Sequence, residues 1–251
     1  MSIAERLDQV IASAWPARHV ENVDGWSCRL TDGVTRRANS VRVVGAPADL
    51  ESAVNLVEAF YQRAQRPPVF LVSDRSAPSE VATALLARGY VSTATTSVLK
   101  STVPAGETPS RHLHVEVESE PTDRWFDAYM AAEVGGRSEG DVAALRDVLL
   151  RPSHPTSFVS VAGHDGAIAS VGQVVVVDGW ASIQCLATMP GLRRQGAGRA
   201  VVDALMAQGV LLGAEGFVAA VLADNAASLG LFEKLGFEHS HSYSYFVVAD
   251  R

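Results

Sequence analysis

The chain has 251 residues, with 21 basic and 28 acidic side chains and a net charge of −7. This length suffices for one large or two small domains, and 47% hydrophobic with 20% charged residues excludes a wholly disordered chain or a coiled coil. An acidic chain lacks the overall basic surface of non-specific nucleic-acid binding, so we expect no nucleic-acid partner. Any anionic ligand requires a local basic cluster.

Cysteine and histidine content limits the possible metal and disulfide sites. Cys28 and Cys185 are too few for a disulfide framework or a four-thiolate zinc site. His239 and His241 have no third ligand nearby in sequence, so we predict no metal site. Residues 1–15 contain two acids among their apolar positions, unlike a signal peptide or a membrane span. We therefore expect a cytoplasmic protein without membrane contact.

The first half of the chain alternates between helical and strand-like periodicity. We predict a helix over 2–15, strands over 25–30 and 38–44 forming a hairpin through a turn at 31–33, a helix from 49 to before 67, a strand over 69–72, a helix over 79–88 and a strand over 90–99.

Residues 101–112 are rich in Pro, Gly, Ser and Thr, which is typical of a linker between domains. In the second half we predict strands over 114–117, 158–162, 172–177, 180–188, 217–222 and 239–248. We also predict helices over 122–132, 140–150 and 226–235, a helix beginning near 196, and a turn at 164–166. Both halves close with a helix, a glycine and a strand, which suggests duplication. We predict two domains, 1–108 and 109–251.

A glycine-rich turn in the second half has the features of a phosphate site. A strand ending at residues 186–188 leads through Arg193 and Arg194 into Gly196, Gly198 and a helix. Glycines allow a ligand to approach the backbone, and the free N–H groups of a helix start attract anions. A P-loop is excluded because no Gly-Lys-Ser/Thr is present, and a dinucleotide fingerprint because the following strand lacks an acidic residue.

This segment resembles the acyl-CoA signature of the GCN5-related N-acetyltransferase family, in which Arg193, Gly196 and Gly198 match the basic and glycine positions. Residues 225–237 resemble the family's closing motif, an Asn followed by a helix and Gly-Phe. The resemblance covers residues 113–251, while residues 1–100 look like a degenerate copy. It implies an α/β fold of two consecutive domains of this type, each a mixed, mostly antiparallel sheet flanked by helices.

The resemblance also implies the cosubstrate, acetyl-CoA, and the residues that bind it. The strand end should line the pantetheine arm, the glycine turn the pyrophosphate, and the closing motif the thiol end. The implied binding residues are Leu186, Ala187, Thr188, Arg193, Arg194, Gln195, Gly196, Ala197, Gly198, Arg199, Asn225 and Ser228.

The catalytic residues are not determined by the sequence. Phe232 replaces the tyrosine that protonates the departing thiolate in the family. Tyr243 and Tyr245 are interpreted first as core packing or a wet sheet surface and second as substitutes for the missing acid or base. The hypothesis is acetyl transfer from acetyl-CoA to a primary amine, small or peptidic, by direct attack through a tetrahedral intermediate, with the Leu186 amide stabilising the oxyanion. The alternative is a non-catalytic CoA-binding regulatory or interaction module.

Three further features have open interpretations. Cys185 is interpreted first as a small buried hydrophobic residue and second as a nucleophile. The donor-rich run 26–39 suits domain docking or surface solvation, with acceptor binding as the alternative. A homodimer is possible.

Overall fold

The computed structural model describes all residues except 103–112, 133–138, 164–165 and 250–251. Most of the predicted linker, including the domain boundary at 108, lies outside the described residues, as do two residues of the predicted turn at 164–166. The helices and strands predicted elsewhere form, with bounds shifted by a few residues.

The N-terminal half begins with a helix held by a capping box, in which Ser2 and Glu5 each bond the other's backbone N–H. Asp49 caps the second helix by accepting from Glu51 N–H. The elements are α1 (Ile3–Ala14), β1 (His19–Val23), β2 (Trp26–Leu30), the short 3-10 helix η1 (Arg36–Ala38), β3 (Val41–Arg42), α2 (Leu50–Arg63), β4 (Val69–Ser73), α3 (Ser79–Ala87) and β5 (Tyr90–Ser101).

The predicted tight turn between the strands at 25–30 and 38–44 is wrong. β2 and β3 do pair antiparallel, with Ser27 opposite Arg42, but a loop containing η1 joins them instead of a tight turn. The tight hairpin lies between β2 and β1, a strand that was not predicted. All but one of the β1 residues are exposed, so the strand has no apolar alternation to signal it.

The C-terminal half follows the predicted order closely. Its elements are β6 (His114–Glu118), α4 (Asp123–Ala132), α5 (Glu139–Leu150), β7 (Thr156–Ala162), β8 (Ile168–Val177), β9 (Trp180–Thr188), the 3-10 helix η2 (Pro190–Leu192), α6 (Ala197–Leu211), β10 (Gly216–Leu222), α7 (Ala226–Lys234) and β11 (Glu238–Val248).

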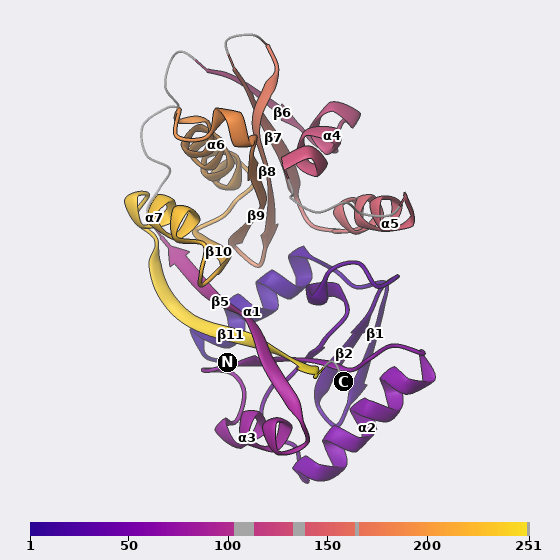
Figure 1. The fold of residues 1–251 in the computed structure, drawn as a ribbon. Coiled ribbons are helices and arrows are strands. Elements are labelled where there is room, and N and C mark those ends of the chain that lie inside the picture. The colour runs from indigo at the N-terminus through magenta and orange to yellow at the C-terminus, as the bar shows by residue number, and fades with distance from the viewer. Residues whose placement is uncertain (103–112, 133–138, 164–165, 250–251) are drawn as a thin grey trace.

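One sheet runs through both halves of the described chain, in the order β1-β2-β3-β4-β11-β5-β10-β9-β8-β7-β6. The last strand of each half is therefore exchanged. β11 pairs antiparallel with β4 and β5, and β5 pairs antiparallel with β10 (Figure 1). Each half thus completes its sheet with a strand from the other.

Helices cover both faces of the sheet. Alternate residues of β8 show this: Val174 and Val176 belong to the core under α6, whereas Val175 and Val177 belong to the core under α1. On that second face, α4 and α5 pack together with Trp15 and Ala38 from the N-terminal half. The two halves therefore share an apolar core besides the sheet.

A buried polar contact joins the first helix to the last strand. Asp8 in α1 lies 2.9 Å from Nε2 of His241 in β11, and both side chains are almost completely buried. The other Asp8 carboxylate oxygen accepts a hydrogen bond from the Ser76 hydroxyl. Both carboxylate oxygens are therefore satisfied.

We predict that Asp8→Ala destabilises the protein by about 2–4 kcal/mol, because it leaves His241 and Ser76 buried without a partner. Urea unfolding followed by circular dichroism measures the change. The control is Asp127→Ala, which removes an exposed carboxylate in α4 and should change stability by less than about 0.5 kcal/mol. Equal stabilities of the two variants would contradict a structural role for the Asp8–His241 contact.

Candidate functional site

The parallel strands β9 and β10 diverge at the centre of the sheet. They pair from Trp180 opposite Gly216 to Ile183 opposite Ala219, and not beyond. Further along, β9 pairs with β8 and β10 pairs with β5. The backbone of residues 184–188 is therefore unpaired on its β10 side, where a ligand can add to the strand.

A β-bulge distorts β9 at the same place. Val171 of β8 lies opposite Ala187 and Gln173 opposite Gln184, so two residues, Cys185 and Leu186, stand against a single one. Cys185 has a φ of 54°, an uncommon conformation for a non-glycine residue. The bulge was not predicted, because Cys185 has ordinary strand propensity and so gives no local signal of a distortion.

The turn after β9 leads to a helix start without a side-chain cap. Gly196 has a φ of 89° and is the N-cap residue of α6, but no side chain caps the helix and no acid lies in its first turn. The N–H groups of residues 197–199 therefore lack intrahelical acceptors, and the helix dipole adds partial positive charge. This end of α6 can bind an anion.

Gly198 marks a close approach between three elements. A Cβ atom at Gly198 would lie 3.1 Å from Oγ1 of Thr188 at the end of β9 and 3.8 Å from Cδ2 of Leu231 in α7. The Thr188 hydroxyl is held 2.9 Å from the Ser170 hydroxyl. The structure therefore brings the predicted strand end and glycine turn together, with α7 beside them.

The arginines of the turn differ in their contacts. Arg193 donates to the Thr188 carbonyl at 3.3 Å, and Arg199 pairs with Asp203 at the same distance. Burial raises the pKa of Asp203, while Arg199 opposes that shift. Arg194 is exposed and makes no hydrogen bond or ion pair with other described residues. Arg194 is therefore the guanidinium most available to a ligand.

Asn225 and Ser228 lie together at the start of α7. The Asn225 side chain accepts from Ser228 N–H at 3.1 Å and so forms the helix cap. The polar end of this helix is exposed. The capping role alone explains the asparagine, and a role beside the cosubstrate stays a prediction.

The aromatic residues singled out by the sequence lie in two cores. Phe232 is 2% exposed and packs edge-on against Phe237, with ring centroids 4.9 Å apart. Tyr243 and Tyr245 lie in the part of β11 that pairs with β4, in the core under α1. Burial and the neighbouring Tyr243 raise the pKa of Tyr245, so its phenol is protonated at neutral pH.

A buried pair of glutamines beside the bulge was missed by sequence analysis. Nε2 of Gln184 donates to the Ala14 carbonyl of α1 at 3.0 Å and to Oε1 of Gln173 at 2.9 Å. Nε2 of Gln173 donates to the Leu149 carbonyl of α5 at 3.3 Å. The pair thus satisfies C-terminal carbonyls of one helix from each half, which otherwise lack partners.

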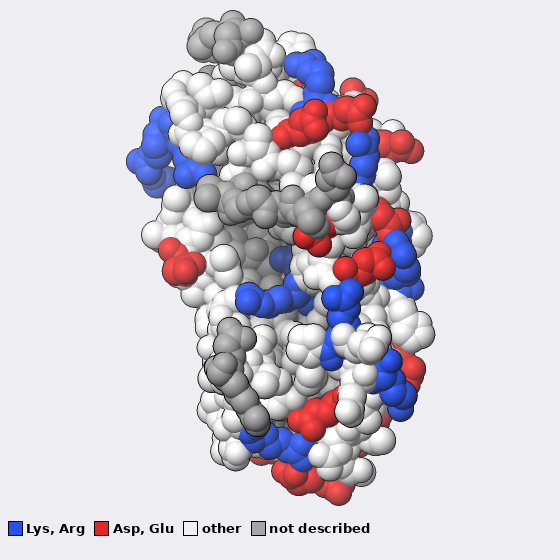
Figure 2. Space-filling view, turned by 45° about the vertical axis from the view of Figure 1, so that its right-hand side comes forward, with Lys and Arg blue, Asp and Glu red and all other residues white. Residues whose placement is uncertain are grey.

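Arginines from the N-terminal half converge close to this pair. A narrow pocket is lined by Arg29, Arg37, Arg42, Asp8 and Tyr243, among others. We call it the arginine pocket. Basic side chains also lie across the middle of the face in Figure 2, where the two halves meet.

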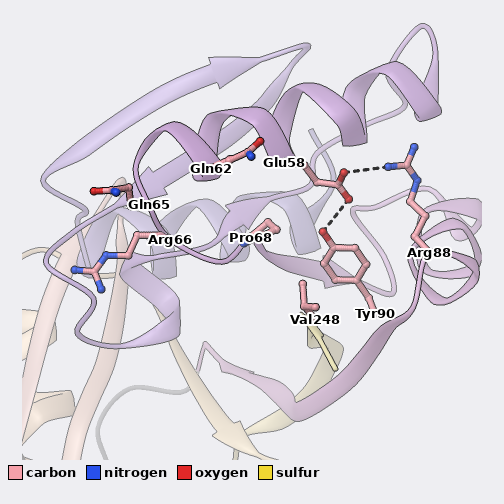
Figure 3. Close-up of a pocket in the computed structure, with 8 residues that line it drawn as sticks. All are labelled: Glu58, Gln62, Gln65, Arg66, Pro68, Arg88, Tyr90 and Val248. Atoms are coloured by element: carbon pink, nitrogen blue, oxygen red, sulfur yellow. Dashed lines mark hydrogen bonds and ion pairs between the residues drawn. The ribbon is translucent and has the colours of Figure 1, made fainter. Parts of the chain in front are cut away.

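A larger hollow, about 490 Å³, lies elsewhere, between α2 and the start of β5 (Figure 3). Its Glu58 carboxylate is occupied by Tyr90 OH at 2.9 Å and by Arg88 at 3.3 Å. The Glu58 carboxylate in this hollow is therefore already paired and is not available as a base. Among the described residues, no three potential metal ligands cluster, and no helix is long and apolar enough to span a bilayer.

Comparisons with known proteins agree on one family. Residues 3–246 match the family described as "Probable histone acetyltransferase Rv0428c C-terminal". The "Uncharacterized N-acetyltransferase YobR" of Bacillus subtilis is 26% identical over 251 residues, covering 98% of both chains.

Solved structures show the same fold. A GCN5-related N-acetyltransferase from Kribbella flavida superposes with a TM-score of 0.77 at 16% identity, over 100% of this chain and 97% of that one. A tandem GNAT protein from the clavulanic acid biosynthesis pathway gives 0.68 at 13% identity, over 98% and 88%. The predicted fold of two domains of this type is confirmed. The chain belongs to the Rv0428c C-terminal family and is a GCN5-related N-acetyltransferase.

Proposed function

We propose that the protein transfers an acetyl group from acetyl-CoA to a primary amine. The observation that supports this most directly is the uncapped start of α6 beside the opening between β9 and β10. The helix start suits a pyrophosphate, and the unpaired edge of β9 suits an amide-bearing arm such as pantetheine.

All of the predicted binding residues except Gln195 have a role in this proposal. Backbone N–H groups of residues 196–199 and the Arg194 side chain bind the pyrophosphate, while Arg193 holds the Thr188 carbonyl in place. Residues 186–188 bind the pantetheine arm through their backbone. Asn225 and Ser228 lie at the thiol end of the cosubstrate.

The reaction needs no covalent enzyme intermediate. The neutral amine attacks the thioester carbonyl, and the Leu186 N–H stabilises the oxyanion of the tetrahedral intermediate. The C–N bond forms and the C–S bond breaks; the thiolate takes the electron pair and, in the net reaction, the proton that the amine nitrogen loses, so the products are the amide and free CoA thiol. Deprotonation at pH 7 costs about 4.6 kcal/mol for a lysine-like amine but about 1.4 kcal/mol for an α-amine of pKa near 8. Amines of lower pKa are therefore the easier acceptors.

Gly196→Asp should weaken CoA binding at least about tenfold, since it puts a carboxylate at the anion site and a side chain at a positive φ. Isothermal titration calorimetry measures the affinity. Gly196→Asn is the matched control, because Asn tolerates positive φ and is neutral. Unchanged affinity in the Asp variant would remove the pyrophosphate assignment.

Arg194→Ala should weaken CoA binding more at low than at high salt, because an exposed contact with phosphate is screened over about 8–10 Å. Titrations at two ionic strengths measure the difference. Arg63→Ala, which removes another exposed arginine far along the chain in α2, should leave the affinity and its salt dependence unchanged. A loss independent of salt would indicate misfolding instead of a lost phosphate contact.

Phe232→Tyr should raise kcat, because the wild-type chain has no phenol at this position to protonate the thiolate. A thiol of pKa about 8.5 leaves as thiolate at pH 7 at a cost of about 2 kcal/mol, so the gain is at most about 30-fold. Release of free thiol from acetyl-CoA measures the rate.

Unfolding measurements must accompany this variant, since Phe232 is buried against Phe237 and a hydroxyl there needs a partner. Tyr243→Phe and Tyr245→Phe complete the test. An unchanged rate in a stable Phe232→Tyr variant, with slower turnover in one of the others, would assign the proton donor to β11.

A further inference from the structure

One buried hydrogen-bond donor and one buried hydrogen-bond acceptor near the bulge in β9 lack partners among the described residues. Oε1 of Gln184, an acceptor, and Nε of Arg37, a donor, are both buried without a hydrogen bond among the described residues. Gln184 is 7% exposed. Its orientation is fixed, because its Nε2 must face the Ala14 carbonyl, and so Oε1 is the unpaired atom.

Each of the two side chains contacts a residue at the C-terminal end of α1. Gln184 bonds the Ala14 carbonyl, and the Arg37 guanidinium lies over the ring of the next residue, Trp15, 5.7 Å from its centroid. Arg37 also interacts electrostatically with the thiol of Cys185, which follows Gln184 in the bulge. A loop of the N-terminal half therefore brings a guanidinium to the distorted part of β9.

The surroundings of Arg37 contain an excess of positive charge. Arg29 and Arg42 line the same arginine pocket, and Asp8 is the only carboxylate among its lining residues. Both Asp8 oxygens are already used by His241 and Ser76.

Within the described part of the chain, Arg29 donates only to backbone carbonyls. Burial and the neighbouring Arg42 and Arg37 lower its pKa to about 10, while Tyr245 and Tyr61 oppose the shift. The arginine pocket therefore favours an added anion.

These observations define the ligand. A ligand that pairs both atoms must carry an acceptor for Nε of Arg37 and a hydrogen-bond donor for Oε1 of Gln184. Resting on the acetyl transfer proposed above, we propose that the acceptor is an amine that also bears a carboxylate, as amino acids do. Arg37 binds its carboxylate and Gln184 Oε1 orients its amine towards the opening between β9 and β10. The arginine pocket has room for about one water molecule, a place that a single carboxylate oxygen would take.

Gln184 positions the amine but cannot remove its proton, because a carboxamide is not basic at neutral pH. The role of the pair is therefore recognition. Arg37 and Gln184 together select acetyl acceptors by the charge of the carboxylate and by the distance between the carboxylate and the amine.

The test compares paired acceptors. Acetyl-CoA turnover is measured with the twenty L-amino acids, β-alanine and γ-aminobutyrate, each also as its carboxamide, and with a lysine peptide lacking acidic residues. The wild type should show kcat/KM at least tenfold higher for the best acid than for its carboxamide. Arg37→Ala should raise the KM of the acid at least tenfold, with little change in its kcat, and abolish the preference. Arg37→Lys should restore part of it.

Arg36→Ala is the matched control, because Arg36 is the exposed neighbour of Arg37 in η1. It should keep the preference, and CoA affinity should be unchanged in every variant. Equal turnover of acids and carboxamides, or preference for the lysine peptide, would overturn the acceptor class while leaving acetyl transfer intact. Binding of CoA without acetylation of any compound would contradict the proposed transfer itself, and the acceptor class with it.

Discussion

The exchange of the last strands is the constraint on which the rest of the structure depends. β5 has β11 on one side and β10 on the other, so the central strand pairs of the sheet each join one half to the other. Separating the halves would break the hydrogen bonds of three ladders, β4–β11, β11–β5 and β5–β10, and expose strand edges. The relative position of the halves is therefore set by the backbone. A residue such as Arg37 can act at β9 only because that position is fixed.

Buried polar contacts between the two halves make their packing specific. Gln173 and Gln184 satisfy carbonyls at the ends of α1 and α5, and Asp8 satisfies His241 and Ser76. Such bonds contribute only about 1 kcal/mol each, but an alternative packing that left these groups buried and unpaired would cost about 1–3 kcal/mol for each group. The apolar core between the halves favours their association, and the buried polar groups restrict it to one arrangement.

Sequence patterns predicted most of the elements, because apolar periodicity and turn residues are local signals. The glycine turn was predicted for the same reason, and the structure places Gly196 and Gly198 at the start of α6 beside β9. Partners across the sheet have no local signal, so the exchange of β5 and β11 could not be read from the chain. Arg37 and Gln184 are 147 positions apart, and each is unremarkable in its own segment.

The bulge in β9 connects the two proposed binding sites. Normal alternation would put Gln184 and Cys185 on opposite faces, yet the bulge lets both interact with groups on the α1 side, while Leu186 packs against the core under α6. The start of α6 lies beside Thr188 and Arg37 interacts with Cys185, so both proposed sites reach the same short stretch of β9. A thioester bound along the edge of β9 would meet an amine held by Gln184 at the point where the two strands part. One local distortion therefore suits the cosubstrate and the acceptor together.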